Sequence, residues 1–470
     1  MKYYHKGVFL LLILAVLGGC DKFLDTTLPK SAIEETELFR QEEAATSALT
    51  AIYASMITGL ASSYQTALLT GLSADELGNP PAEASGFYVN AILPENTANE
   101  NYWRDAYNTI YRVNATYEGC RQSITQNPEI KKQLTGEALF IRAYFYFYLV
   151  NFYGDVPLVL TTDYRQNERM NRTPKHLIYD QILKDLYAAS GDLQKSYIGQ
   201  NNLPTTSERI RPNKAVATAL LARIYLYLER YVEAESLATS LIDDSTMYAL
   251  VGPKEVFLKN SKEALWQLLP PTPNFGHINT MEGEEFILSG KPGKGEKPWL
   301  NKELLSAFEK GDLREATWIG LYNDSAGSIP YAYKYKARRG DEVTEYTVVV
   351  RLAEQYLIRA EARTHKGQYL AALADLNIIR RRAGLSLLTN VGIPLNYQTL
   401  MKLILKERQV ELFTEQGHRW LDLKRIGDID RIMNKVIVEK GGLWKKGREL
   451  WPIPARDISL NGQLQQNPGY

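Results

Sequence analysis

The apolar positions between Arg351 and Gly384 predict a helical hairpin. Apolar and small residues recur there at three- and four-residue intervals on both sides of Lys366 and Gly367, at Leu352, Tyr356, Leu357, Ala360, Tyr369, Ala372, Leu373, Leu376 and Ile379. Gly367 supplies the backbone freedom for a turn, and Gly384 stands where a left-handed cap would end the second helix. Because such a pair of helices buries one face only, the rest of the chain has to supply partners.

A second stretch, from Lys214 to Ala238, has the same pattern. A turn near Glu229 separates two helical runs, whose small and aromatic positions are Ala219, Ala222, Tyr225, Tyr231 and Ala234. Both stretches are similar to tetratricopeptide hairpins, although neither has the full consensus and the spacing between them is irregular. They predict an all-α, mostly helical protein built on such hairpins. The alternative is a non-repetitive helical bundle.

Three further stretches predict helices that pack with the hairpins. Residues 38–57 have helical apolar spacing and stop before Gly59, and residues 103–114 place aromatic side chains along one face. Residues 136–152 include an unbroken aromatic run that starts at Tyr144, so this helix is apolar on nearly all sides. Because such a helix has to be buried all round, it predicts the centre of the core. The globular part is expected to start near residue 38.

Two long stretches lack helical spacing and predict loops. Residues 60–100 mix Gly and Pro with aromatic side chains and carboxylates, and residues 266–300 interrupt the helical pattern of the second half. Loops on a rigid scaffold often bind ligands, so we expect these two inserts to pair and to form a loop-rich, variable face. The alternative is that they are structural loops that cover the scaffold.

The first twenty residues have the layout of a secreted lipoprotein signal. Basic residues start the chain, residues 8–17 are an apolar run too short to span a bilayer, and the letters LGGC close the run at Cys20. This segment resembles a bacterial lipobox, in which residues 1–19 are removed and Cys20 is acylated. The alternative is that Cys20 is an ordinary residue after a normally cleaved signal. Residues 20–37 are polar and predict a lipidated tether.

Charge and composition narrow the function classes. A formal net charge of +1 over 470 residues argues against nucleic-acid binding. The 30 tyrosines suit polar ligand surfaces as well as helix packing. Beyond the signal, Cys120 and the widely separated His176, His277, His365 and His418 give no zinc motif, and the sequence has no nucleophile elbow. The sequence therefore predicts no cofactor, no catalytic residue and no metal site built from His and Cys, and it leaves open whether calcium is held.

Charged residues recur at helical spacing near the C-terminus. Opposite signs alternate at three- and four-residue intervals, at Glu407, Arg408, Glu411, Glu415, Arg419, Asp422 and Arg425. We expect ion pairs along one helix, with Trp420 and Leu423 in the core. Carboxylates that lie among arginines have lowered pKa values and make poor general acids, so catalysis is not expected there.

Several segments together resemble the SusD/RagB family of outer-membrane nutrient-binding lipoproteins of Bacteroidetes. They are the lipobox followed by DKFLD, WRDAYNTIYRVN, GEALFIRAYFYFYLVNFYGDVPLV, the hairpin that starts at Arg351, KERQVELFTEQGHRWLDLKRIG, LWPIP and the ending QNPGY. No single motif decides the resemblance, but the segments occur in the family's order over nearly the whole chain.

The resemblance implies tetratricopeptide-like hairpins on one side of the protein and a variable, loop-rich region on the other. Residues 38–250 would form an N-terminal SusD-like region and residues 251–470 a C-terminal SusD/RagB region, packed together as one globular unit. Members of the family sit on the outer leaflet as lids over a SusC-type TonB-dependent transporter. They help to capture oligosaccharides or, in some members, peptides, and they are not enzymes.

The residues expected to bind ligand lie in or beside the two inserts. A sugar ring has a face of C–H bonds and a rim of hydroxyl groups, so it requires an aromatic platform and a few polar partners. We expect stacking from Tyr64, Tyr88, Trp103, Trp266 and Trp299, and hydroxyl contacts from Asp75 and Asn101. Alternatively, Trp103 and Trp266 anchor the helices beneath the loops. The competing function is an anchored glycoside hydrolase, which requires two carboxylates about 5 to 10 Å apart in a cleft.

Overall fold

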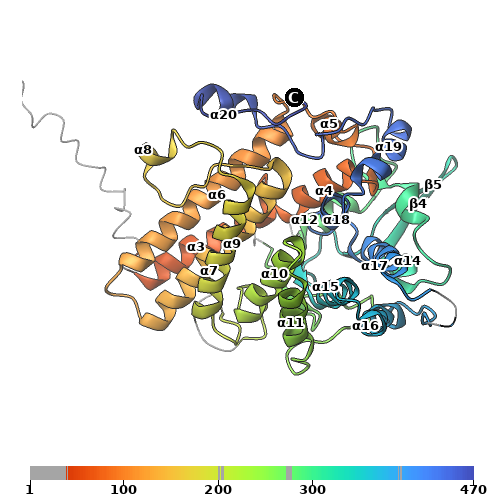
Figure 1. Ribbon diagram of the computed structural model, residues 1–470, viewed down its shortest axis with the longest axis horizontal. Helices are drawn as coiled ribbons and strands as arrows, with labels where there is room; N and C mark the ends of the chain where they lie inside the picture. The colour runs from red at the N-terminus through yellow and green to blue at the C-terminus, as the bar shows by residue number, and fades with distance from the viewer. Residues whose placement is uncertain are drawn as a thin grey trace, which may run out of the picture.

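Helices make up most of the protein, and its strands are few and short (Figure 1). The structure, a computed structural model, describes residues 41–199, 206–270, 278–389 and 394–470, together with Phe39, Asn202 and Val391. The predicted signal, the tether and Cys20 therefore lie outside the described residues. The mostly helical class that the sequence predicts is confirmed.

The described helices that precede the first hairpin are α3 (Glu42–Thr58), α4 (Ser63–Ser73), η2 (Ala82–Ala84), α5 (Ser85–Tyr88), α6 (Thr97–Gln122), α7 (Pro128–Tyr153), α8 (Tyr164–Asn167) and α9 (Lys175–Asp192). Four of these helices, α4, α6, α7 and α8, begin at a side-chain cap. The Asn96 side chain accepts a hydrogen bond from the Asn99 N–H before α6, and Asn127 caps α7 just before Pro128. Both helices therefore start earlier than their apolar spacing indicates.

Helix α7 lies at the centre of the core. Every residue from Gln133 to Tyr153 is buried, and α6 and α9 pack against the helix. Trp451 covers its C-terminal end. The indole stacks on Phe152 with 4.1 Å between ring centroids, and the backbone N–H of Trp451 donates to the Phe152 carbonyl at 2.7 Å. The burial on nearly all sides that the sequence predicts for this helix is confirmed.

The two predicted hairpins form, and they pack against each other. They consist of α10 (Lys214–Tyr227) with α11 (Tyr231–Ile242), and of α15 (Leu352–His365) with α16 (Tyr369–Arg382); α11 lies against α15. Gly367 has φ +73°, the left-handed conformation that the turn between α15 and α16 requires. In the described part of the chain, four helices follow the second hairpin: α17 (Tyr397–Leu412), α18 (His418–Arg425), α19 (Ile429–Glu439) and α20 (Ala455–Leu460).

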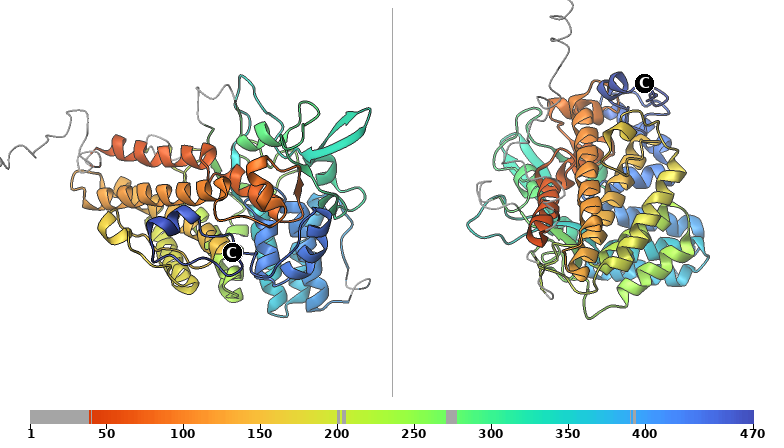
Figure 2. Two further views of the ribbon diagram at one scale, coloured as in Figure 1. Left: turned by 90° about the horizontal axis from the view of Figure 1, so that it is seen from above. Right: turned by 90° about the vertical axis from the view of Figure 1, so that its left-hand side faces the viewer.

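Most of residues 278–345 lie on the side of the molecule away from the hairpins (Figure 2). The described strands pair two by two and antiparallel: β1 (Leu77–Gly78) with β3 (Trp299–Leu300), β2 (Ala264–Leu268) with β6 (Thr347–Arg351), and β4 (Ile319–Asp324) with β5 (Gly327–Ala332). Short helices accompany them: α12 (Met281–Phe286), α13 (Lys302–Leu305) and α14 (Leu313–Trp318). The β1–β3 pair joins the two stretches predicted as loops. That prediction is only partly right, because α4 lies in the first stretch and α12 in the second.

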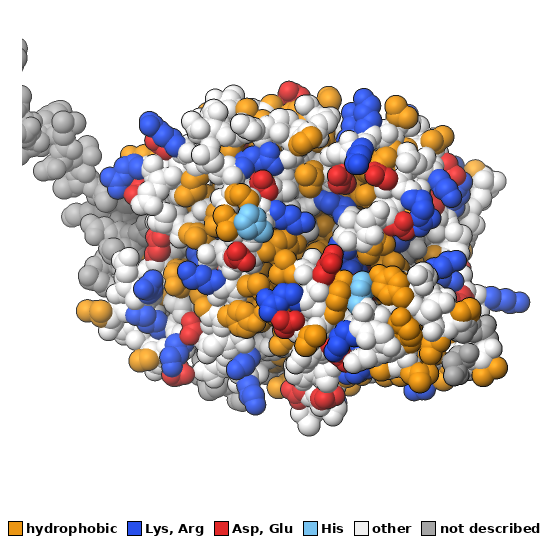
Figure 3. Space-filling view, in the orientation of Figure 1, with side chains coloured by type: hydrophobic (Ala, Val, Ile, Leu, Met, Phe, Trp, Pro, Cys, Tyr) orange, Lys and Arg blue, Asp and Glu red, His pale blue; other side chains and the backbone are white. Residues whose placement is uncertain are grey.

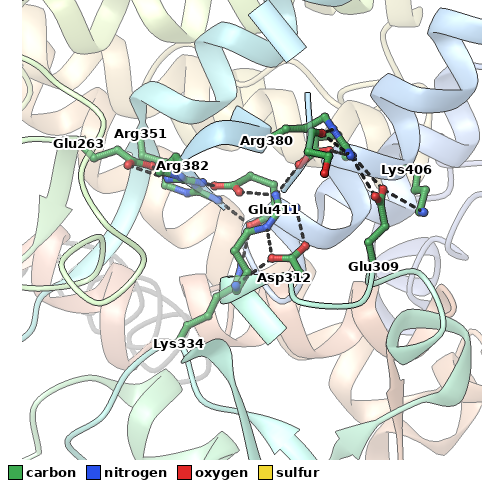
Figure 4. Close-up of polar contacts among 12 residues, drawn as sticks. Glu263, Glu309, Asp312, Lys334, Arg351, Arg380, Arg382, Lys406 and Glu411 are labelled. Atoms are coloured by element: carbon green, nitrogen blue, oxygen red, sulfur yellow. Dashed lines mark hydrogen bonds and ion pairs between the residues drawn. The ribbon is translucent and has the colours of Figure 1, made fainter. Parts of the chain in front are cut away.

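A buried ionic network joins the elements of the second half. Glu411 on α17 accepts a hydrogen bond from Arg314 Nη1 of α14 at 2.9 Å, and it also binds Arg351 of β6 and Arg382 of α16 (Figure 4). Arg351 in turn donates to Glu263 at 3.0 Å. Because a buried charge that loses its partner is costly, this network fixes the relative positions of these elements.

The predicted ion pairs along one C-terminal helix are wrong for most of the residues concerned. Helix α17 ends at Leu412 and α18 begins at His418, so the charged positions do not share one continuous helix. Their side chains instead reach other elements, in the pairs Arg408–Asp422, Arg419–Asp75 and Arg425–Glu361. The Arg425–Asp422 pair does span one helical turn. Trp420 and Leu423 are buried, as predicted.

Candidate functional site

A cavity of about 440 Å³ lies where the two loop-rich inserts meet. Its wall is formed by the corner between α3 and α4, by η2, by the first turns of α6, by α12 and by the loop at Gly295. The side chains that line it include Tyr64, Gln65, Glu83, Asn101, Met281, Glu285 and Glu296. The volume falls within the range of small-molecule sites in proteins.

Asn79 holds the loop that closes one side of this cavity. Its side-chain nitrogen donates to the carbonyl groups of Gly293 (3.1 Å) and Lys297 (2.8 Å), and its side-chain oxygen accepts from the Gly295 N–H at 2.8 Å. Asn79 has φ 55°, a left-handed conformation that asparagine adopts more readily than most residues. Beside it, β1 pairs with β3. The expectation that the two inserts pair is therefore confirmed.

The lining of the cavity is acidic. Glu83, Glu285 and Glu296 line it, and among the described residues no Lys or Arg side chain does so. Carboxylates accept hydrogen bonds from ligand hydroxyl groups, and the Asn101 amide can accept or donate them. No group of three or more His, Cys, Asp or Glu side chains in the described part of the chain is placed to hold a metal ion. The cavity therefore suits a hydroxyl-rich or cationic ligand better than an anion.

Tyr64 gives the cavity an aromatic wall and a neutral hydroxyl group. Its ring lies 5.2 Å from the ring of Phe286, measured between centroids, and is tilted by 60°. Burial raises the pKa of the Tyr64 hydroxyl, and the nearby carboxylates of Glu285 and Glu282 raise it further. The hydroxyl group therefore stays protonated at physiological pH and can donate a hydrogen bond.

Three of the predicted ligand residues lie in or near the cavity. Tyr64 and Asn101 both line it. Trp299 is half-buried in β3, beside the loop that Asn79 holds, and the backbone of Gly78 lies against its indole. A Cβ atom at Gly78 would come within 2.6 Å of Trp299 Nε1, so a residue without a side chain is needed there. The ligand contacts of these three residues stay predictions.

Tyr88 and Asp75 do not line the cavity. Tyr88 is half-buried, with the Lys440 ammonium 4.9 Å from its ring centroid. Asp75 is buried and binds the Arg419 guanidinium through bonds of 2.8 and 2.6 Å. Burial alone would raise the pKa of the Asp75 carboxyl, but Arg419 holds it below its ordinary value. Asp75 thus has a structural partner in place of the ligand hydroxyl that we expected.

Trp103 and Trp266 are core residues, which corrects their predicted stacking role. Trp266 has no exposed surface and Trp103 is 2% exposed. The Trp103 indole N–H donates to Asp457 Oδ1 at 3.1 Å, and that of Trp266 donates to the Ile210 carbonyl at 3.2 Å. Neither ring has a free face for a ligand. The alternative role, in which the two rings anchor the helices beneath the loops, fits the structure.

Sequence reasoning missed the acidic side of the cavity. Glu285 lies in α12, where the Thr280 side chain accepts a hydrogen bond from the Gly283 N–H at 2.9 Å. A threonine followed by the letters MEGEEF has the signature of a helix start with an acidic first turn. That signature could have predicted a short helix bearing carboxylates within the second insert.

Comparison with known proteins places the chain in a family. Residues 279–470 match the family model described as "SusD family", and residues 22–226 match the one described as "Starch-binding associating with outer membrane". The chain belongs to the SusD/RagB family. The resemblance that the sequence motifs indicate is thereby confirmed.

Relatives of this SusD/RagB chain match it over nearly its whole length. Two SusD-like proteins of Formosa agariphila are each 25% identical to it, one over 98% of both chains and the other over 100% of both. A solved SusD superfamily structure from Bacteroides vulgatus has a TM-score of 0.78 at 20% identity and covers 92% of this chain and 100% of its own. A structure described as a laminarin-binding SusD-like protein has a TM-score of 0.72 at 23% identity, over 91% of this chain and 99% of its own. The solved structures establish that the fold is shared.

Proposed function

We propose that this SusD/RagB chain is a lipid-anchored outer-membrane protein that captures neutral oligosaccharides at the cell surface, as the lid subunit of a SusC-type TonB-dependent transporter. The observation that carries the proposal is the cavity between α4, α6 and α12, which combines the Tyr64 ring, the Asn101 amide and three carboxylates. One of the two matching family models is described as starch-binding and associated with the outer membrane, which supports both the ligand class and the location.

Recognition in this cavity would combine ring contact with hydrogen bonds. The C–H face of a sugar would lie against Tyr64, and its hydroxyl groups would donate to Glu83, Glu285 or Asn101. Since no basic side chain among the described residues lines the cavity, the carboxylates would repel a uronic acid or a sulfated sugar. Among oligosaccharides, the acidic lining therefore favours neutral ones over anionic ones.

A cationic peptide is the second candidate ligand, and the same acidic lining favours it. A Lys or Arg side chain of a peptide would form charge-assisted hydrogen bonds with Glu83 or Glu285. Such a protein would be a peptide-binding lipoprotein of the RagB type. A peptide and a neutral sugar depend differently on the carboxylates, because only the peptide requires their charge.

The proposed role includes no chemical step. Glycoside hydrolysis, the competing function, requires a carboxylic acid that protonates the leaving group and a second carboxylate that acts as base or nucleophile. Incubation of the purified protein with maltoheptaose and laminariheptaose separates the two functions. Time-dependent formation of shorter products would contradict a pure binding role.

Capture by such a protein does not require tight binding. We expect dissociation constants of roughly micromolar to millimolar, or about 4 to 8 kcal/mol. Acyl chains on Cys20 would keep the protein at the membrane, and the transporter beneath it would rebind a released ligand at high effective concentration. Binding of modest strength also lets the ligand leave toward the transporter.

Calorimetric titration with neutral and anionic oligosaccharides tests the proposal. We expect maltoheptaose or laminariheptaose to bind and an oligogalacturonate not to bind. Asn101→Ala should weaken the binding about tenfold, and Glu285→Lys should abolish it. Glu315→Lys, at an exposed position of α14 outside the cavity, should leave it unchanged. Binding that survives both cavity variants, or a preference for cationic peptides, would overturn the neutral-sugar assignment.

A further inference from the structure

A second cavity, of about 450 Å³, lies among the helix ends on the hairpin side of the molecule. Its lining includes Tyr227, Tyr231, Glu361, His365, Tyr397 and Arg425, and it shares no lining residue with the first cavity. In the space-filling view, hydrophobic side chains gather around a histidine over the ends of α15 and α17 (Figure 3). The two cavities are therefore separate, and they are lined by different elements.

Three aromatic rings form one wall of this second cavity. Tyr231 stacks on His365 with 3.9 Å between centroids and an angle of 11° between planes. The His365 ring lies 5.0 Å from the ring of Tyr397, edge to face at 77°. Tyr397 is 38% exposed, so part of this wall faces solvent. Tyr231 begins α11, Tyr397 begins α17 and His365 ends α15. The His365 ring contacts both tyrosine rings, so it joins the three into one wall.

His365 contributes an uncharged ring to this wall. Burial lowers its pKa, and Arg425 lowers it further against the opposing effect of Glu361. At neutral pH the imidazole is therefore neutral, and the wall carries no positive charge. A neutral ring stacked on a tyrosine offers a flat surface of the kind that C–H bonds contact favourably.

The polar side of the cavity is formed by Arg425 and by the carboxylates of Glu229, Glu361 and Asp428, and Arg425 is paired within the protein. Arg425 Nη2 donates to Glu361 Oε2 at 2.8 Å, and Arg425 Nε donates to Asp422 Oδ1 at 2.9 Å. The Arg425 guanidinium also lies 5.4 Å from the Tyr227 ring centroid. A cationic ligand would compete with Arg425, and an anionic ligand would be repelled by Glu361. A neutral ligand with hydroxyl groups can use the donor and acceptor capacity that remains on both groups.

We propose that this cavity is a second saccharide-binding site, which holds a sugar ring against Tyr231, His365 and Tyr397 and its hydroxyl groups on the Glu361–Arg425 pair. Flat aromatic faces beside a neutralised ion pair match the C–H face and the hydroxyl rim of a neutral sugar. A groove of about 900 Å³ continues from the cavity and shares Leu405, Ile426 and Asp428 with it. The groove gives room for more than one ring of a chain.

The second site shares its ligand class with the proposed function, but it uses none of the same residues. Its role would be to hold a second stretch of one glycan, or a second glycan, on the hairpin face. Two sites on one anchored protein raise the retention of a long glycan through effective concentration, without tighter contacts at either site. The first cavity can therefore fail as a sugar site while the second stands, and the converse also holds.

Two methionine methyl groups separate these outcomes. Met281 lines the first cavity and Met401 lines the second. In the ¹³C-methyl-methionine NMR spectrum of the full chain, assigned with Met281→Leu and Met401→Leu, we expect a titration with maltoheptaose or laminariheptaose to shift the Met401 signal. The shift should persist in the Asn101→Ala variant of the first cavity. A shift of Met281 alone with both sugars would overturn the second site and leave the first intact.

Substitutions in the aromatic wall complete the test. Tyr397→Ala and Tyr231→Ala should each lower the sugar affinity measured from the Met401 signal about tenfold. Tyr111→Ala, at an exposed tyrosine of α6 outside both cavities, should leave this affinity unchanged. Tyr397 is partly exposed at the first position of α17, so its truncation leaves the core intact. If both wall variants keep the wild-type sugar affinity measured at Met401, the proposal is overturned. A Met401 shift caused by an apolar peptide and by neither sugar would also overturn it.

Discussion

The guanidinium of Arg223 on α10 forms a two-bond ion pair with the Glu354 carboxylate on α15, at 2.6 and 2.7 Å. Both side chains are almost fully buried, and the pair joins the two hairpins across 131 positions of the sequence. It also connects residues 38–250 to residues 251–470. The pair therefore supports the proposal that these two regions form one globular unit.

Arg223→Leu should lower the free energy of unfolding by about 3–5 kcal/mol, because it leaves the Glu354 carboxylate buried without its partner. Urea unfolding monitored by circular dichroism measures the loss. The double variant Arg223→Leu/Glu354→Leu should recover part of it, since no unpaired charge is then buried. Arg230→Leu is the matched control, because its pair with Glu233 is exposed and should contribute almost nothing. Equal losses at Arg223 and Arg230 would contradict the prediction.

Glu76 should make stability depend on pH. Burial, with the neighbouring Asp75 carboxylate, raises the pKa of Glu76 from 4.5 to about 8. Between these values the unfolded chain has released the proton and the folded chain still holds it, so stability falls as pH rises from 4.5 to 8. Glu76→Gln removes this dependence. We therefore expect the stability of the variant relative to the wild type to rise between pH 5 and pH 8. A difference between their free energies of unfolding that stays constant over this range would contradict the prediction.

Asn79→Ala should weaken both stability and binding at the first cavity. The substitution removes the three hydrogen bonds that hold the Gly293–Lys297 loop, and it places alanine at φ 55°. Both changes should lower the free energy of unfolding, by about 1–3 kcal/mol in total. Asn90→Ala is the matched control, since Asn90 has φ 48° and one buried side-chain bond but does not line the cavity. Calorimetry should show weaker sugar binding for Asn79→Ala only. A loss of affinity in both variants would indicate a general effect of destabilisation.

Cys20→Ala should give a folded protein that no longer fractionates with membranes. The tether precedes the first helix of the described part, α3, which begins at Glu42, so the change should not disturb the core. Membrane fractionation and circular dichroism measure the two properties. Cys120→Ala is the control. Cys120 is the chain's other cysteine and is buried in the core, so this variant should still fractionate with membranes. Loss of folding in Cys20→Ala would contradict the predicted boundary near residue 38.

The sequence predicts helices well and their ends poorly, for one physical reason. Apolar spacing marks the buried face of a helix, and that face defines both hairpins and α7. The polar first turns of α6 and α7 carry no such spacing and depend on caps such as Asn96 and Asn127. Spacing of charges is weaker still as a guide, because Arg419 and Arg425 find partners on distant elements that no local pattern reveals.

The candidate site was predictable as a region and only partly as a set of residues. The two inserts stood out because they lack helical spacing, and they do meet around Tyr64 and Asn101. Composition does not show whether an aromatic ring points to the core or to solvent. Sequence reasoning therefore assigns Trp103 and Trp266 to the ligand, although both lie in the core. Sequence reasoning does not identify Glu285, because it lines the cavity only where α12 meets α4 and α6, which lie far away in the chain.

The contact of Trp451 with Phe152 has a consequence for the order in which the protein can form. The ribosome delivers the chain from its N-terminus, so the aromatic end of α7 emerges long before the indole that covers it. Until then this apolar surface is open to other chains, and a nascent protein in that state is prone to aggregate. Coverage of this end of α7 by Trp451 is therefore a late event, and a chain that stops before Trp451 would leave the Phe152 ring uncovered.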